Sequence, residues 1–118
     1  MVISAAFFSG LLKARPSDAV ARKGPYALLK KELNRTIRNR PGARQLGGLY
    51  LAAYPEEKNL DRLAGDLLAG VREGDPGALR RRIQDLRMRD FAREDTVIIG
   101  GWVLARVEAR VCALIRLL

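Results

Sequence analysis

The side chains that most often perform chemistry in proteins are scarce in this chain of 118 residues. It contains no histidine and one cysteine, Cys112. The absence of histidine excludes Ser-His-Asp and Cys-His catalytic arrangements and every Cys/His zinc pattern. A lone cysteine also excludes an intrachain disulfide. We therefore expect no catalytic residue, no metal ligand and no cofactor, and we expect a fold that depends on packing.

Two reactive side chains stand in the apolar stretch at the C-terminus of the chain. Cys112 has apolar neighbours on both sides, and a cysteine in such a setting usually acts as a small hydrophobe. Glu108 is a carboxylate on a mostly apolar stretch and needs a partner. We expect a structural ion pair, with Arg110, Arg106 or an arginine of the preceding helix as the partner. An enzyme would instead need two carboxylates that face each other in a deep pocket.

Positive charge is the most unusual bulk property, and it is unevenly distributed. The net charge is +9, and residues 1–50 contain ten Lys and Arg but only two acidic residues. The densest part is the segment 22–44, and a second cluster follows at 80–82. Such surfaces attract anionic partners. The candidate docking residues for such a partner are Lys30, Lys31, Arg35, Arg38, Arg80, Arg81 and Arg82.

These basic residues have three interpretations. In the first, they solvate helix faces or pair with the acidic segment 56–75. In the second, they dock an acidic protein or an anionic membrane surface. In the third interpretation, residues 22–44 and 80–82 contact the phosphate backbone of a nucleic acid. Aromatic residues make up only 6% of the chain, and no zinc-finger, RNP or GXXG motif indicates base recognition.

Hydrophobic periodicity predicts a chain made mainly of helices, with breaks at Gly and Pro. Gly24-Pro25 predicts a break, and Gly47-Gly48 marks either a bend or a close approach by another helix. The predicted helical segments are 2–14, a short turn at 17–22, 26–39, 43–54, 55–73, 76–90 and 103–118.

A short strand is predicted at 96–99, where β-branched residues are concentrated. One strand cannot pair its own backbone groups. It pairs with residues 2–4 or with its copy in a second subunit, unless it is an extended loop. Gly100-Gly101 lacks a phosphate-loop pattern, so we expect a tight turn from the strand into the last helix. Trp102 is then expected to anchor the start of that helix in the core.

The last predicted helix, 103–118, is apolar around most of its circumference, which is typical of a buried helix. Four charged residues interrupt it, and charges within a membrane span cost about 2.5–3.5 kcal/mol each. We therefore expect no integral membrane span. The predicted fold is a single, mainly α-helical domain of residues 1–118. It is a small bundle of five or six helices, with one extended segment (96–99) before a central C-terminal helix.

Three stretches, 46–56, 90–97 and 101–114, resemble a pattern in small bacterial proteins of uncharacterised function. The C-terminal part of the pattern is Gly101-Trp102, then Glu108-Ala109-Arg110, then Cys112-Ala113-Leu114. Many of these proteins are exported with twin-arginine leaders, which this sequence lacks. The resemblance implies a compact bacterial domain and no catalytic motif. We expect a cytoplasmic location, with export under a missing leader as the alternative.

The combined expectation is a non-enzymatic accessory or protein-interaction domain. It would dock a protein partner, or a second copy of itself, through the basic N-terminal helices or through apolar surface near Trp102. The alternative is a nucleic-acid-binding protein that uses residues 22–44 and 80–82.

Overall fold

The computed structural model of the chain describes residues 16–118 except 73 and 76, with side chains from residue 26 onward. Most of these residues are helical, so the predicted mainly α-helical fold is confirmed. The predicted first element, 2–14, lies outside the described residues. The elements in chain order are α2 (Pro16–Thr36), α3 (Arg40–Ala53), the 3-10 turn η1 (Pro55–Glu57), α4 (Leu60–Leu68), α5 (Ala78–Ala92), β1 (Thr96–Ile99), β2 (Trp102–Ala105) and α6 (Arg106–Leu117).

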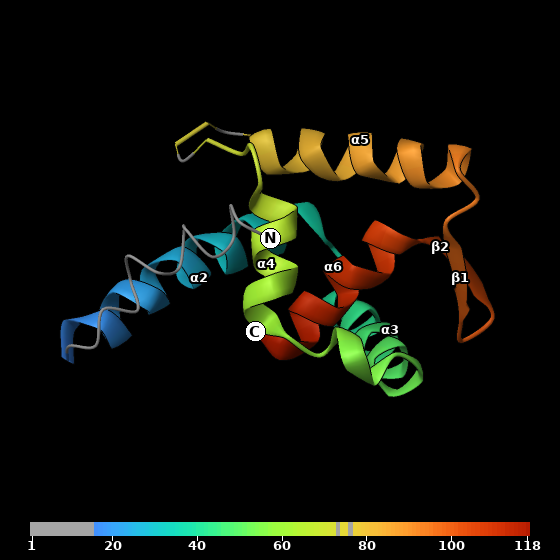
Figure 1. Cartoon of the computed structure of the whole chain (residues 1–118), viewed down its shortest axis with the longest axis horizontal. Helices are drawn as coiled ribbons and strands as arrows, with labels where there is room; N and C mark the ends of the chain where they lie inside the picture. The colour runs from blue at the N-terminus through green and yellow to red at the C-terminus, as the bar shows by residue number, and fades with distance from the viewer. Residues whose placement is uncertain (1–15, 73, 76) are drawn as a thin grey trace.

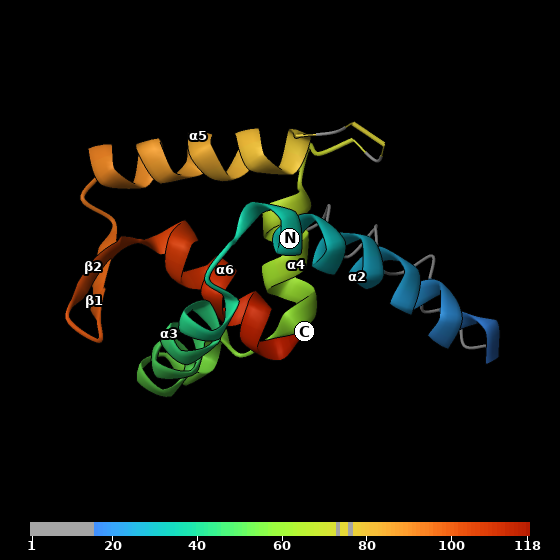
Figure 2. The same ribbon diagram turned by 180° about the vertical axis from the view of Figure 1, so that it is seen from behind.

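Helix α6 lies at the centre of the fold, as its apolar sequence predicts. Helices α3, α4 and α5 all pack against it (Figure 1 and Figure 2). Helix α2 approaches it with its C-terminal part, where Leu33 and Ile115 line the same depression, and its N-terminal part projects away. Burial contributes about 1.5–3 kcal/mol for each large aliphatic side chain, so α6 is the main source of core stability. Its buried residues are Val107, Ala109, Val111, Ala113, Leu114 and Ile115.

Several predicted helix boundaries are wrong: α4 ends at Leu68 and not at 73, α5 begins at Ala78 and not at 76, and larger differences occur in α2 and at the start of α4. Helix α2 continues through Gly24-Pro25, although a proline inside a helix costs about 3 kcal/mol. Leu29 and Leu33, which follow the proline, are 2% and 1% exposed, and their burial holds this part of the helix in place. Helix α4 begins at Leu60 and not at Pro55, because the side chain of Asn59 accepts the N–H of Arg62 and caps the helix.

The predicted strand is one half of a β-hairpin. β1 pairs antiparallel with β2, with Ile98 opposite Val103 and Ile99 opposite Trp102. The partner is thus the next segment of the chain, which was not among the three expected alternatives. Gly100-Gly101 does not lead into a helix as expected. Its φ angles of 56° and 83° form the two-residue turn whose twist matches a hairpin, so α6 begins only at Arg106.

Helices α3 and α6 form the largest interhelical contact of the described residues, and they meet at Gly47. A Cβ atom at this position would overlap the backbone carbonyl of Cys112 and lie 2.9 Å from the amide nitrogen of Ala113. Only glycine lets the two backbones approach this closely. Of the two predictions for Gly47-Gly48, the close approach is confirmed.

We expect Gly47→Ala to lower the free energy of unfolding by about 2–3 kcal/mol, because overpacking against rigid backbone outweighs the gain in helix propensity. Gly48→Ala is the matched control. Its Cβ would lie 3.6 Å from Nε of Arg116, an ordinary contact, so this variant should gain about 0.5–1 kcal/mol. Urea unfolding of both variants measures the difference. Equal stabilities would contradict the close approach at Gly47.

Candidate functional site

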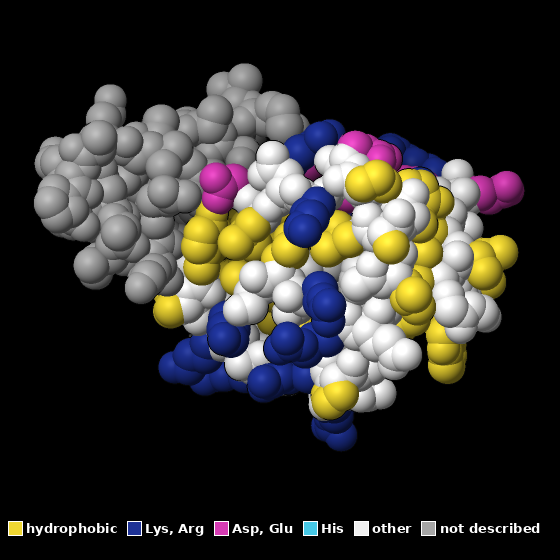
Figure 3. All heavy atoms as spheres, turned by 90° about the horizontal axis from the view of Figure 1, so that it is seen from below, with side chains coloured by type: hydrophobic (Ala, Val, Ile, Leu, Met, Phe, Trp, Pro, Cys, Tyr) yellow, Lys and Arg dark blue, Asp and Glu magenta, His cyan; other side chains and the backbone are white. Residues whose placement is uncertain are grey.

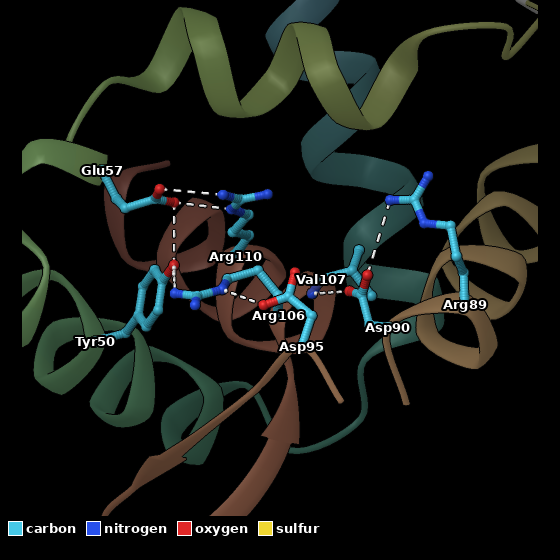
Figure 4. Close-up of polar contacts among 8 residues, drawn as sticks. All are labelled: Tyr50, Glu57, Arg89, Asp90, Asp95, Arg106, Val107 and Arg110. Atoms are coloured by element: carbon cyan, nitrogen blue, oxygen red, sulfur yellow. Dashed lines mark hydrogen bonds and ion pairs between the residues drawn. The ribbon is translucent and has the colours of Figure 1, made fainter. Parts of the chain in front are cut away.

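A series of polar side chains joins α3, η1 and the first turns of α6 (Figure 4). Arg110 donates two hydrogen bonds to Glu57, from Nε at 2.8 Å and from Nη2 at 3.1 Å. The Tyr50 hydroxyl donates to Oε1 of Glu57 at 3.0 Å, and Arg106 donates to the Tyr50 oxygen at 3.3 Å. Tyr50 is fully buried and the Glu57 side chain is 13% exposed, so water is largely kept from these bonds.

The pKa shifts in this cluster are those of a structural ion pair. The hydrogen bonds from Arg110 lower the pKa of Glu57, and the same bonds raise the pKa of Arg110. Burial raises the pKa of the Tyr50 hydroxyl. A general acid near neutral pH needs a carboxyl group with a raised pKa. Glu57 is shifted in the opposite direction, so its charge is used to hold η1 against α6.

Two aspartates of the α5–β1 region satisfy the first backbone N–H groups of α6. The carboxylate of Asp90, which is 4% exposed, accepts the N–H of Val107 at 2.8 Å. The backbone carbonyl of Asp95 accepts the N–H of Arg106 at 3.1 Å, and its side chain accepts Nε of Arg106 at 3.2 Å. A buried helix N-terminus needs such acceptors, and its dipole favours negative charge there. Asp90 and Asp95 therefore position α6.

Glu108 and Arg110 form two separate ion pairs. Glu108 binds Nε of Arg87 on α5 at 2.9 Å and accepts the backbone N–H of Ala105 at 2.9 Å. Its partner is thus an arginine of the preceding helix, one of the three alternatives from the sequence. Arg110 is bound to Glu57, whose role no sequence pattern indicated because the two residues are 53 positions apart.

A groove of about 280 Å³ lies between α4, α5 and α6. Two carboxylates, Asp66 and Asp90, line it together with apolar side chains. The carboxylate of Asp90 already accepts the N–H of Val107 in α6, and it lies 3.8 Å from Nη2 of Arg89. Arg82, also in the lining, donates to the backbone carbonyls of Asp66 and Leu67 at the end of α4. Most polar groups of the groove therefore already have partners within the fold.

Cys112 lies in α6 at the contact with α3. Burial, and to a lesser degree the nearby charge of Glu108, raises the pKa of its thiol to about 11. A reactive cysteine needs a lowered pKa and access to solvent. The structure therefore supports the packing role that the sequence indicates.

Apolar side chains are exposed on the hairpin. Ile98, Trp102 and Val103 are 72%, 65% and 58% exposed, whereas Val97 and Ile99 are buried. The expectation that Trp102 anchors the core is wrong, because β2 places it beside the hairpin turn. This turn rests on α3, since a Cβ at Gly100 would lie 3.3 Å from Cδ1 of Leu49. We call Ile98, Trp102, Val103 and the 45% exposed Leu49 the hairpin surface.

The seven predicted docking residues are not equivalent: six belong to α2 and α5, and Arg38 lies in the bend between α2 and α3. On α5, Arg81 is paired with Asp75 at 3.0 Å and Arg82 is bonded to α4, so only Arg80 has no partner among the described residues. On α2, the carboxylate of Glu32 lies 3.8 Å from Arg35. The other α2-side residues, Lys30, Lys31 and Arg38, are exposed without ion pairs within the described part of the chain.

The predicted set omits Arg40 and Arg44, although their i, i+4 spacing places both on one side of α3. It also omits Arg116, whose guanidinium lies over Gly48, one further turn along α3. Only the packing of α6 against α3 brings Arg116 to this position.

Comparison with protein families, curated proteins and solved structures finds no match. Among the described residues, no helix combines the length and hydrophobicity needed to cross a membrane. The same residues contain no cluster of three or more Cys, Asp or Glu side chains able to hold a metal ion.

The bond between Glu57 and Arg110 should make stability depend on pH. Because the folded-state pKa of Glu57 is lowered, its contribution is present above the unfolded-state pKa, about 4.3. It is lost as pH falls through the folded-state pKa. We expect Glu57→Gln to lower the free energy of unfolding by about 1–2 kcal/mol at pH 7. The loss should shrink between pH 5 and pH 3, as urea unfolding can measure.

Glu56→Gln is the control for this experiment, because Glu56 is exposed and has no partner among the described residues. It should keep the wild-type dependence on pH. A Glu57→Gln variant whose stability follows the wild-type curve at all pH values would disprove the role of this ion pair.

The raised pKa predicts slow alkylation of Cys112 by iodoacetamide. At pH 8 the thiolate fraction of the folded protein should be roughly 200-fold below that of a free cysteine. The rate should therefore rise by about this factor in guanidinium chloride. Similar rates in the folded and unfolded protein would show that the thiol is accessible and ionised.

Proposed function

We propose that this protein is a non-enzymatic interaction module whose hairpin surface docks a protein partner. The observation that supports the proposal is the exposure of Ile98, Trp102 and Val103 on two strands of four residues each. Exposed apolar side chains gathered in one place mark interaction sites. Tryptophan is among the residues that contribute most binding energy in protein interfaces.

The backbone of the hairpin is well suited to this role. Ile98 and Val103 face each other in the ladder and share the solvent side, while Val97 and Ile99 are buried on the other side. Trp102 is paired with Ile99 and so lies on this second side, where it stays 65% exposed at the turn end of the hairpin. The hairpin is thus fixed to the fold through Val97 and Ile99, and it presents Ile98 and Val103 on its free face and Trp102 at its turn end. Such rigid presentation reduces the entropy lost on binding.

The polar groups of the fold favour a binding role over a catalytic one. Glu57, Asp90, Asp95 and Glu108 each hold a backbone or guanidinium group in place. In the groove this leaves Asp66 as the one carboxylate without a partner among the described residues. Two-carboxylate catalysis would need a second free group, so we propose no enzymatic activity and no cofactor.

A photoreactive amino acid at position 98 should capture the partner, which is then purified for titration. We expect Ile98→Thr, Trp102→Thr and Val103→Thr together to weaken binding by at least about 30-fold, the loss typical of one tryptophan at the centre of an interface. Threonine keeps the β-branched character of the strands. Leu28→Gln is the control, because Leu28 is 47% exposed but lies on α2.

Trp102 is the only tryptophan, so its fluorescence reports on the hairpin alone. Its emission should resemble that of free tryptophan in the isolated protein and shift to the blue when the partner binds. Sedimentation of the wild-type and triple variants shows whether the partner is a second copy. Unchanged affinity of the triple variant, or loss of affinity in Leu28→Gln alone, would refute the proposal.

A further inference from the structure

A second surface of the protein is basic and is built from three helices. Lys30 and Asn34 of α2 and Arg40 and Arg44 of α3 line one shallow depression. The guanidinium of Arg116 lies over Gly48, one turn beyond Arg44 on the same side of α3. We call Lys30, Asn34, Arg40, Arg44 and Arg116 the basic face. Figure 3 shows Lys and Arg side chains gathered on this side of the molecule.

The charges of the basic face are not neutralised within the fold. None of its four cations forms an ion pair with the described residues, whereas six other arginines do. The first turn of α3 contains no acidic residue, so the positive end of the helix dipole adds to the same potential. Four like charges close together repel one another, and a polyanion would relieve this repulsion.

We propose that the basic face binds the phosphate backbone of double-stranded nucleic acid without reading its sequence. Arg40, Arg44 and Gly48 follow one another at intervals of four residues, so the cations along α3 span about 12 Å. One strand of B-DNA presents a phosphate about every 3.4 Å along the axis. The face thus meets about three or four phosphates. Arginine, lysine and asparagine are the side chains that commonly bind phosphate oxygens.

The surroundings of the basic face favour a duplex over other anionic partners. Of its apolar lining residues, Leu33 and Ile115 are buried and Leu118 is partly buried, so it has no large exposed apolar centre for a protein interface or for insertion into a bilayer. The exposed aromatic side chains of the described residues, Phe91 and Trp102, lie on α5 and β2. Binding of single strands depends on aromatic stacking, which the basic face cannot provide.

Fluorescence anisotropy with a labelled duplex of random sequence tests the proposal on the full chain. We expect log Kobs to fall with log [NaCl] with a slope of about −3 to −4, which is roughly a 100-fold loss of affinity between 50 and 200 mM salt. The variant Lys30→Gln, Arg40→Gln, Arg44→Gln should reduce the slope to about −1.

A control variant with the same loss of net charge is Arg72→Gln, Arg80→Gln, Arg93→Gln. These three arginines are exposed and lie outside the basic face. The control should keep the wild-type slope, and both variants should keep the wild-type melting temperature because exposed substitutions change stability little. If the first variant does not fold, Arg40→Gln and Arg44→Gln tested singly should each reduce the slope by about one.

Four outcomes would overturn the proposal. The first is a duplex that shows no salt-dependent binding, and the second is an equal loss of affinity in both triple variants. The third is a single strand that binds more tightly than the duplex. The fourth is binding of polyglutamate or phosphatidylserine vesicles through the same residues at least as tightly as the duplex. The last result would assign the basic face to an acidic protein or to a membrane surface.

Discussion

The close contact between α3 and α6 is the constraint on which the rest of the structure depends. It requires a glycine at position 47, because any side chain would collide with the backbone at Cys112. Small residues in α6, Ala109 and Ala113, are completely buried. The two helices form the centre on which α4, α5 and the hairpin are placed.

A buried central helix also needs partners for its free N–H groups, and this need explains the positions of Asp90 and Asp95. Asp90 at the end of α5 and Asp95 before β1 both bind the first turn of α6. Glu57 and Glu108 bind arginines that hold η1 and α5 in place. These carboxylates neutralise arginines near the N-terminal end of α6. The cations of the basic face have no such partners in the described fold, so their charges are not neutralised there.

The sequence predicts the features that depend on local pattern. The apolar C-terminal helix, the amphipathic helices around it and the two explanations for Gly47-Gly48 all follow from spacing along the chain. The hairpin was missed because Val103 to Ala105 are compatible with helix or strand. The choice depends on positive φ at both glycines and on the pairing of β2 with β1. Contacts such as Glu57 with Arg110 depend on the three-dimensional fold and leave no mark in local sequence.

Helix α3 connects the two proposed binding surfaces. Its first turns contribute Arg40 and Arg44 to the basic face, and Leu49, two turns further on, supports the hairpin turn. Gly47 lies between these two groups at the contact with α6. A change in the distance between α3 and α6 would therefore move Arg116 relative to Arg44 at one surface and the hairpin relative to Leu49 at the other. A rigid crossing keeps both surfaces preformed, which lets each bind without reorganising the fold.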